Sequence, residues 1–288
     1  MMPATASKYR FLLIQAFRLA EGASYRMRPM EGRKEEMLLN HDQLAPFLAD
    51  VDWDLHPGAP ATHGNHPVEL RQEFLTVGAN RLPIVRDACA SGKYNAIVLL
   101  GGGDPGFLAA REIGRQHRIP VTSCAHAQMH VATVLGGRFG VIDISEAHNM
   151  HMHDLIVQYR FAERCAAIRN INFPLPRPGM TEPFPVQDEK ARAERGEPSA
   201  MVEAAVRESI AAIEEDGAEV LIIGCSAAYW LQPILQARLE ALGWEVPVLE
   251  GYRCAIEQAK LLVDLGLDAS GLAFPSDRPR QWRRRKLV

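Results

Sequence analysis

Short runs of apolar residues alternate with longer amphipathic stretches along most of the chain. This alternation is typical of βαβ units, in which helices cover a buried parallel sheet. The apolar runs predict strands at Tyr9–Phe17, Val51–Leu55, Ala96–Leu100, Pro120–Cys124, Phe139–Ile144, Glu219–Gly224 and Val246–Leu249, and a weaker one at Ala166–Arg169. The pattern therefore predicts an α/β fold.

The amphipathic stretches predict helices at Glu69–Ser91, Phe107–His117, His126–Leu135, His148–Phe161, Ala191–Glu215, Trp230–Leu242 and Ala255–Leu265. We expect the first of these helices to break near Pro83, because proline lacks the N–H that a helix interior uses. The stretch Asn170–Val186 holds five prolines and predicts a long ordered loop or lid.

Two segments share one order of features: a buried strand, a glycine, a turn of small residues and a helix. They are NAIVLLGGGDPGFLAARE, which begins at Asn95, and AEVLIIGCSAAYWLQPIL, which begins at Ala218. Both turns follow the carboxyl end of a strand, which is where ligands bind in open parallel sheets. The similarity suggests two related halves that face one another.

Composition and charge limit the classes of partner. At 288 residues, with 47% hydrophobic and 23% charged residues, the chain is typical of a soluble protein with about two domains. A net charge of −3 gives no general attraction to nucleic acid or membranes, and no apolar run approaches the ~18–20 residues of a spanning helix. The basic tail Pro275–Val288 is expected to be hydrated. A small-molecule substrate is the expected partner.

The N-terminus lacks the apolar segment of a secretory signal. The cysteines form an odd, scattered set without a CxxC pair, which argues against a disulfide framework or a structural zinc site. They are Cys89, Cys124, Cys165, Cys225 and Cys254. We therefore expect a cytoplasmic protein with free thiols.

The glycine-rich turn GGGDPGF allows two interpretations. Gly101, Gly102 and Gly103 permit positive φ angles and close approach of backbone N–H groups, so the turn to Asp104 is suited to hold a carboxylate or an imide oxygen. Alternatively, Asp104 is the N-cap of a helix that begins with proline. The two interpretations are compatible, and the spacing fits neither a dinucleotide fingerprint nor a P-loop.

Cys225 stands in GCSAAYW, at the end of a strand and the start of a helix. A helix N-terminus lowers a thiol's pKa from ~8.5 and makes the thiolate available as a base or nucleophile. A buried cysteine is otherwise a small hydrophobic residue, but the strand-end position beside Ser226 favours a functional thiol. Cys124 also ends a predicted strand and is a second candidate, whereas the remaining cysteines are interpreted as core residues.

The histidines form two groups that are candidate metal ligands. His126 and His130 are four residues apart on one predicted helical face, which is a spacing that metal sites use. A second group, His148, His151, His153 and Asp154, follows shortly afterwards. The glutamate of an HEXXH motif is missing and histidine-rich helices are commonly on the surface, so we predict no metal.

Two blocks, Asn95–Ile142 and Gly217–Leu267, resemble hydantoin and allantoin racemases of the Asp/Glu/hydantoin racemase superfamily. The resemblance implies two Rossmann-like parallel-sheet domains related by a pseudo-twofold axis, with the active site in the cleft between them. The implied lobes are residues 1–124 plus 250–288 and residues 125–249. It also implies a homo-oligomer without a cofactor, in which one thiolate removes the proton α to a carbonyl and the opposite thiol delivers a proton.

The sequence departs from this family at specific positions. The family's first cysteine falls on Gly101, so Cys225 is the cysteine that is kept, a pattern that resembles arylmalonate decarboxylases. Asp143, Ile144 and Ser145 stand where racemases usually show threonines, and Gln15 where they tend to show asparagine. A second acid or base must then come from elsewhere, and Cys124 and His126 are the candidates.

These observations give one main expectation and two alternatives. The main one is a racemase or isomerase that acts on the α-carbon of a hydantoin-like ring or an α-substituted carboxylate. The alternatives are a one-cysteine lyase or hydrolase of the same fold and a non-catalytic small-ligand-binding protein. The predicted catalytic residues are Cys225 and Cys124, and the predicted substrate-binding residues are Gln15, Gly101, Gly102, Gly103, Asp104, His126, Ser145 and Ser226.

Overall fold

The computed structural model describes residues 7–23, 26–180, 185–275 and 281, and over these residues it forms two four-stranded parallel sheets. The first sheet contains β1 (Tyr9–Ile14), β2 (Val51–His56), β3 (Ala96–Leu99) and β4 (Val121–Ser123) in the order β2-β1-β3-β4. The second contains β5 (Phe139–Asp143), β6 (Cys165–Asn170), β7 (Val220–Ile223) and β8 (Val248–Leu249) in the order β6-β5-β7-β8. The predicted α/β class is confirmed.

Both sheets have the same topology. When the four strands of a sheet are numbered in sequence order, the second strand lies at one edge, followed by the first, the third and the fourth. β3 and β7 are therefore equivalent third strands, and every residue in both is buried, as expected of parallel strands that are covered on both faces. The two segments with similar sequences thus occupy equivalent places. Their turns lie at the carboxyl edges of the two sheets.

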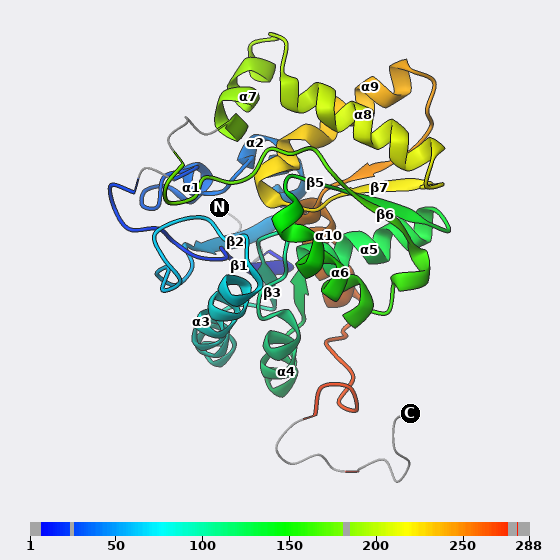
Figure 1. Cartoon of the computed structure of the whole chain (residues 1–288). Helices are drawn as coiled ribbons and strands as arrows, with labels where there is room; N and C mark the ends of the chain where they lie inside the picture. Colours follow the sequence, from blue (N-terminus) through cyan, green and yellow to red (C-terminus); the bar gives the residue numbers. More distant parts are fainter. Residues whose placement is uncertain (1–6, 24–25, 181–184, 276–280, 282–288) are drawn as a thin grey trace, which may run out of the picture.

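Helices cover the sheets in layers (Figure 1). Their bounds are α1 (Lys34–Met37), α2 (His41–Leu48), α3 (Arg71–Ala90), α4 (Phe107–His117), α5 (Cys124–Leu135), α6 (Asn149–Gln158), α7 (Pro185–Glu194), α8 (Ala200–Glu214), α9 (Gln232–Ala241) and α10 (Gly251–Asp264), with 3₁₀ turns η1 (Glu146–His148), η2 (Ala162–Arg164) and η3 (Ser226–Leu231). α3 and α4 pack together beside the first sheet, and α8 packs on β5 and β6.

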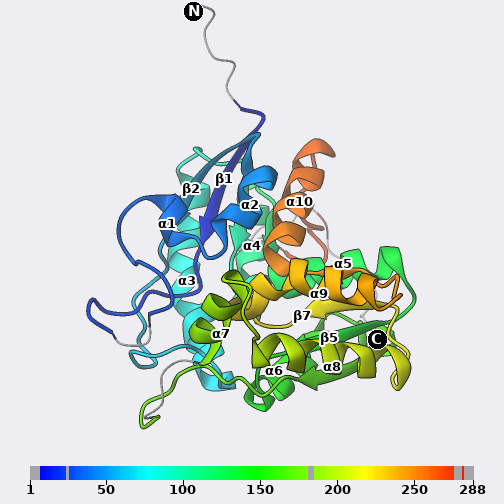
Figure 2. The same cartoon turned by 90° about the horizontal axis from the view of Figure 1, so that it is seen from above.

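α10 follows the last strand of the second sheet but packs against β3 and β4 of the first sheet and against α5 (Figure 2). α5 in turn contacts β7 as well as β4. One hydrophobic cluster contains Phe11 and Val98 from the first sheet together with Leu221 and Ile223 from the second. The two halves therefore share a continuous core, and the assignment of residues 1–124 plus 250–288 to one lobe stays our proposal.

Several predicted elements differ from the structure. α3 runs through Pro83 without a break, because buried residues on both sides of the proline, among them Val77 and Val85, hold the helix against its neighbours. The predicted helix 191–215 is two helices, α7 and α8, and the Ser199 hydroxyl caps α8 by accepting from the N–H of Val202. The short helices α1 and α2 were not predicted.

The proline-rich stretch has no regular structure over residues 171–180, as expected, and residues 181–184 and nearly all of the basic tail lie outside the described residues. Within the described part of the chain, no helix has the length and apolar character needed to cross a membrane.

Candidate active site

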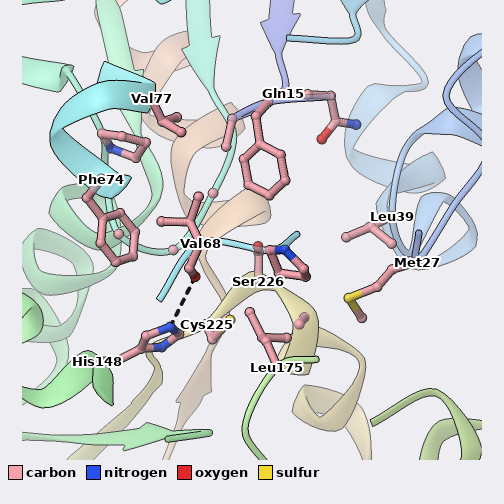
Figure 3. A pocket seen from close by; sticks show the side chains of 18 of the residues that line it. Gln15, Met27, Leu39, Val68, Phe74, Val77, His148, Leu175, Cys225 and Ser226 are labelled. Atoms are coloured by element: carbon pink, nitrogen blue, oxygen red, sulfur yellow. Dashed lines mark hydrogen bonds between the residues drawn. The ribbon is translucent and has the colours of Figure 1, made fainter. Parts of the chain in front are cut away.

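The turns that follow β3 and β7 meet at one cavity (Figure 3). A Cβ placed on Gly102 would overlap the carbonyl oxygen of Gly224 and lie 3.0 Å from the Cα of Cys225. Glycine is therefore required at position 102 because the two backbones touch there. The cavity brings together six of the predicted residues, namely Gln15, Gly101, Gly102, Gly103, Cys225 and Ser226.

Gly101 has a φ of +117°, a conformation that L side chains rarely adopt, and a Cβ there would lie 3.2 Å from that of Ala16. The turn is therefore built around glycine, and position 101 is poorly suited to any side chain.

Cys225 is 8% exposed and lies between β7 and the 3₁₀ turn η3. Burial raises the pKa of its thiol, and the nearby Asp143 raises it further, while the N–H of Ala227 opposes this only in part. The raised pKa is the opposite of the lowered pKa that the sequence predicts, because burial of the thiol and the nearby Asp143 carboxylate outweigh the N–H group at the start of η3. The thiol is therefore neutral at rest.

Asp143 ends β5 and lines the same cavity as His148. The Nδ1 atom of His148 lies 3.1 Å from Asp143 Oδ1, which also accepts from the N–H of Ile144. Asp143 Oδ2 is buried without a hydrogen-bond partner and lies next to Gly224. The sequence pattern marks His148 only as a candidate metal ligand and Asp143 only as a departure from the family, so neither is predicted as a site residue. An aspartate at a strand's carboxyl end with a histidine five residues later was the signal that could have found this pair.

The rest of the cavity wall is mostly apolar. Its side chains come from both halves and from the proline-rich loop: Phe17, Leu19, Met27, Met30, Leu39, Val68, Phe74, Val77, Met152 and Leu175. The loop is held in place by Glu69, whose carboxylate accepts from the N–H of Leu175, and by Arg177, which forms two 2.8 Å hydrogen bonds to Glu73.

Arg28 is a polar exception in this wall, beside Ser226 and Tyr252. Its guanidinium is partly buried, and burial lowers its pKa. Among the described residues, no carboxylate forms a salt bridge with Arg28. A positive group without an acidic partner in a mostly apolar cavity is suited to an anionic or strongly polar part of a ligand.

Asp104 does not line this cavity, and it is not the N-cap of α4, which begins without a side-chain cap. Its carboxylate instead caps α5, where it accepts from the N–H groups of Ala125 and His126, and it also accepts from the hydroxyls of Ser123 and Tyr159. The capping prediction was thus wrong about the helix, because the partner is adjacent in space and not in sequence.

Three further predicted residues lie outside the set that lines the cavity. Cys124 is fully buried and its thiol donates to the Leu99 carbonyl at 3.4 Å. His126 packs against Phe107, and burial lowers its pKa to about 3. The Ser145 hydroxyl accepts from a backbone N–H at the start of η1. A role for these residues in the site stays a prediction that their positions do not support.

The histidine pair His126 and His130 is in contact, with 3.1 Å between the two Nε2 atoms. Over the described residues, however, no group of three or more histidine, cysteine, aspartate or glutamate side chains is arranged to hold a metal ion.

The chain is similar in sequence and in structure to proteins of one family. The family model for Asp/Glu/Hydantoin racemase matches residues 62–259. A hydantoin racemase from Pseudomonas sp. (strain NS671) is 31% identical over 178 residues, which are 62% of this chain and 62% of that protein. The matched part is thus less than two thirds of that relative.

Solved structures agree. The allantoin racemase from Klebsiella pneumoniae is similar with a TM-score of 0.67 and 25% sequence identity, over 94% of this chain and 95% of that one. A glycine-to-cysteine mutant of arylmalonate decarboxylase is similar in fold, with a TM-score of 0.53, 13% identity and coverage of 88% and 93%. Because the family match spans more than half of the sequence, the chain belongs to the Asp/Glu/hydantoin racemase family.

Proposed function

We propose that this protein is an enzyme that moves a proton at the carbon α to a carbonyl, through the thiol of Cys225, and that it thereby racemises a hydantoin-like ring or an α-substituted carboxylate. The observation that carries the proposal is the position of Cys225, where two glycine turns touch beside one cavity. Backbone N–H groups of such turns are suited to hold a carbonyl or carboxylate oxygen, so charge on an enolate is stabilised where it develops.

The cavity wall indicates what the substrate carries. Its apolar side chains favour a substrate with an aliphatic or aromatic substituent, and Arg28 with Ser226 favours a polar or anionic group on the same molecule. A five-membered hydantoin with an apolar substituent and an α-substituted acid both meet this description. The names of the relatives, hydantoin racemase and allantoin racemase, agree with the first of the two.

A one-cysteine lyase is a second candidate that specific observations favour. Gly101 offers no proton, and its φ of +117° disfavours a side chain. The neutral thiol of Cys225 is suited to deliver a proton to a carbanion that the loss of carbon dioxide leaves behind. A hydrolase that opens a hydantoin-type ring is the remaining variant of this candidate.

The reaction is distinguished by incubating the protein in deuterated water with 5-substituted hydantoins, α-substituted carboxylates and aryl-substituted malonates. Chiral chromatography with mass detection then reads product identity, configuration and deuterium content. We expect one deuterium at the α-carbon and both enantiomers. A single enantiomer with loss of carbon dioxide would support the lyase, and a ring-opened product the hydrolase. Binding without any change in these compounds would contradict an enzymatic function.

We also propose that the enzyme acts without a metal or organic cofactor, in the cytoplasm and as a homo-oligomer. Proton transfer at the α-carbon requires no metal or organic cofactor, since a thiol transfers the proton and backbone amides contact the oxyanion. Activity that survives dialysis against a strong chelator is the expected result.

A further inference from the structure

Asp143 and His148 form the most unusual polar group in the cavity. Both are almost completely buried, at 1% and 6% exposure, and both line the cavity that holds Cys225. Asp143 fixes one ring nitrogen of His148 at 3.1 Å. The other, Nε2, lies 3.4 Å from the Val68 carbonyl oxygen, a contact drawn in Figure 3. This distance is longer than the usual 2.7–3.2 Å of an N–H···O bond, so Nε2 is only weakly engaged.

Racemisation needs a second group that exchanges protons with the α-carbon. Position 101 does not supply one, because it is a glycine with a φ that L side chains rarely adopt. Cys124 and His126 lie outside the cavity lining, whereas His148 lines the cavity together with Cys225. We propose that His148, oriented by Asp143, is the second proton-transfer group of the site and works together with Cys225. The inference rests on the proposed function and names a catalytic residue for it.

The charges around His148 support this role. Burial lowers the pKa of its imidazole, but Asp143 and Glu69 raise it by more, so the pKa lies above the ordinary 6.5. His151 also faces His148, and its Nε2 atom lies 2.8 Å from the Gly103 carbonyl oxygen. A histidine whose ring is oriented by a carboxylate and lines the same cavity as a thiol is suited to act as a general acid or base.

Cys225 and His148 together account for every proton that the reaction moves. In one direction, neutral His148 accepts the α-proton at Nε2 as the C–H bond breaks, and Cys225 gives its S–H proton to the α-carbon. His148 is then an imidazolium beside the Asp143 carboxylate, and Cys225 is a thiolate. In the opposite direction the thiolate removes the α-proton and the imidazolium returns its own. No oxidant, reductant or further reactant is needed.

The test uses D- and L-5-benzylhydantoin in deuterated water, with His148→Gln, Asp143→Asn and, as a control, His153→Gln on the exposed face of the same helix region. Glutamine keeps an amide donor near the place of Nε2 but does not titrate. We expect His148→Gln to lose at least ~10²-fold in kcat with KM within a few-fold, and to lose one limb of the pH–rate profile. Asp143→Asn should shift that limb to lower pH, since the carboxylate that raises the His148 pKa is gone.

The control should retain the wild-type rate and profile. Wild-type-like kcat and pH profile in His148→Gln, with Cys225→Ser inactive, would overturn this inference and leave the proposed function standing. Exchange that neither Cys225→Ser nor His148→Gln affects, or a wild type without exchange, would overturn both. If His148→Gln fails to fold by circular dichroism, an unshifted limb in Asp143→Asn overturns the inference instead.

Discussion

Gly102→Ala tests whether the two glycine turns must touch. Gly102 has no left-handed φ, so the cost of a side chain there is one of space. Ordinary contacts of a Cβ lie at 3.4–4 Å, but an added Cβ would overlap the Gly224 carbonyl oxygen and lie 3.0 Å from the Cys225 Cα. Both are backbone atoms, so the turns must separate by about 1 Å. Overpacking of this kind costs about 1–3 kcal/mol.

The assay for this variant is urea denaturation followed by circular dichroism, together with α-proton exchange. We expect a free energy of unfolding lower by about 1–3 kcal/mol, and exchange lower by ~10²-fold, because a shift of about 1 Å at a reacting group is that costly. The control is Gly271→Ala, where the added Cβ meets only the flexible end of Arg115. If Gly102→Ala matched this control within about 0.5 kcal/mol and kept full activity, the close contact of the turns would not matter.

Two further predictions concern the proline-rich loop and the cavity residue Arg28. Burial raises the pKa of the Glu73 carboxyl, but Arg177 and two backbone N–H groups lower it by more, from 4.5 to about 2. The charged carboxylate therefore contributes about 3 kcal/mol to the free energy of unfolding above pH 4.5, and this contribution is lost as the pH falls toward 2. In Glu73→Gln we expect the free energy of unfolding to be about 3 kcal/mol lower at pH 7 and to change less between pH 4.5 and 2. An unchanged pH dependence would show that Glu73 is not its source. Arg28→Gln should raise KM about 10-fold or more for a carboxylate-bearing substrate and less for a neutral hydantoin, and equal effects on both would show that Arg28 does not meet the anion.

The sequence allowed the scaffold to be predicted where burial alone determines it. β3 and β7 are buried on both faces, so their apolar runs stand out, and the turns that follow them could be placed at one edge. Helix α3 shows the limit of this reasoning. Pro83 argues for a break by local chemistry, but packing on both sides of it keeps the helix continuous.

The side-chain roles that were missed depend on contacts between elements. Asp104 reaches across to cap α5, a partner about 20 positions away in the chain, so local capping rules assigned it to the wrong helix. The pairing of Asp143 with His148 is local, but its importance comes from the cavity, which the sequence does not display. The raised pKa of Cys225 has the same origin, since burial and the nearby Asp143 are properties of the folded chain.

The central claim, that the thiol of Cys225 transfers the α-proton, is tested most directly by the rate of deuterium incorporation in Cys225→Ser compared with Cys124→Ser. The two substitutions are chemically identical and both sites are buried, but only Cys225 lines the cavity. A serine hydroxyl is a far weaker acid than a thiol, so we predict a loss of at least ~10²-fold in Cys225→Ser. Cys124→Ser should stay within a few-fold of the wild type. Full exchange in Cys225→Ser, or a selective loss in Cys124→Ser, would contradict the account.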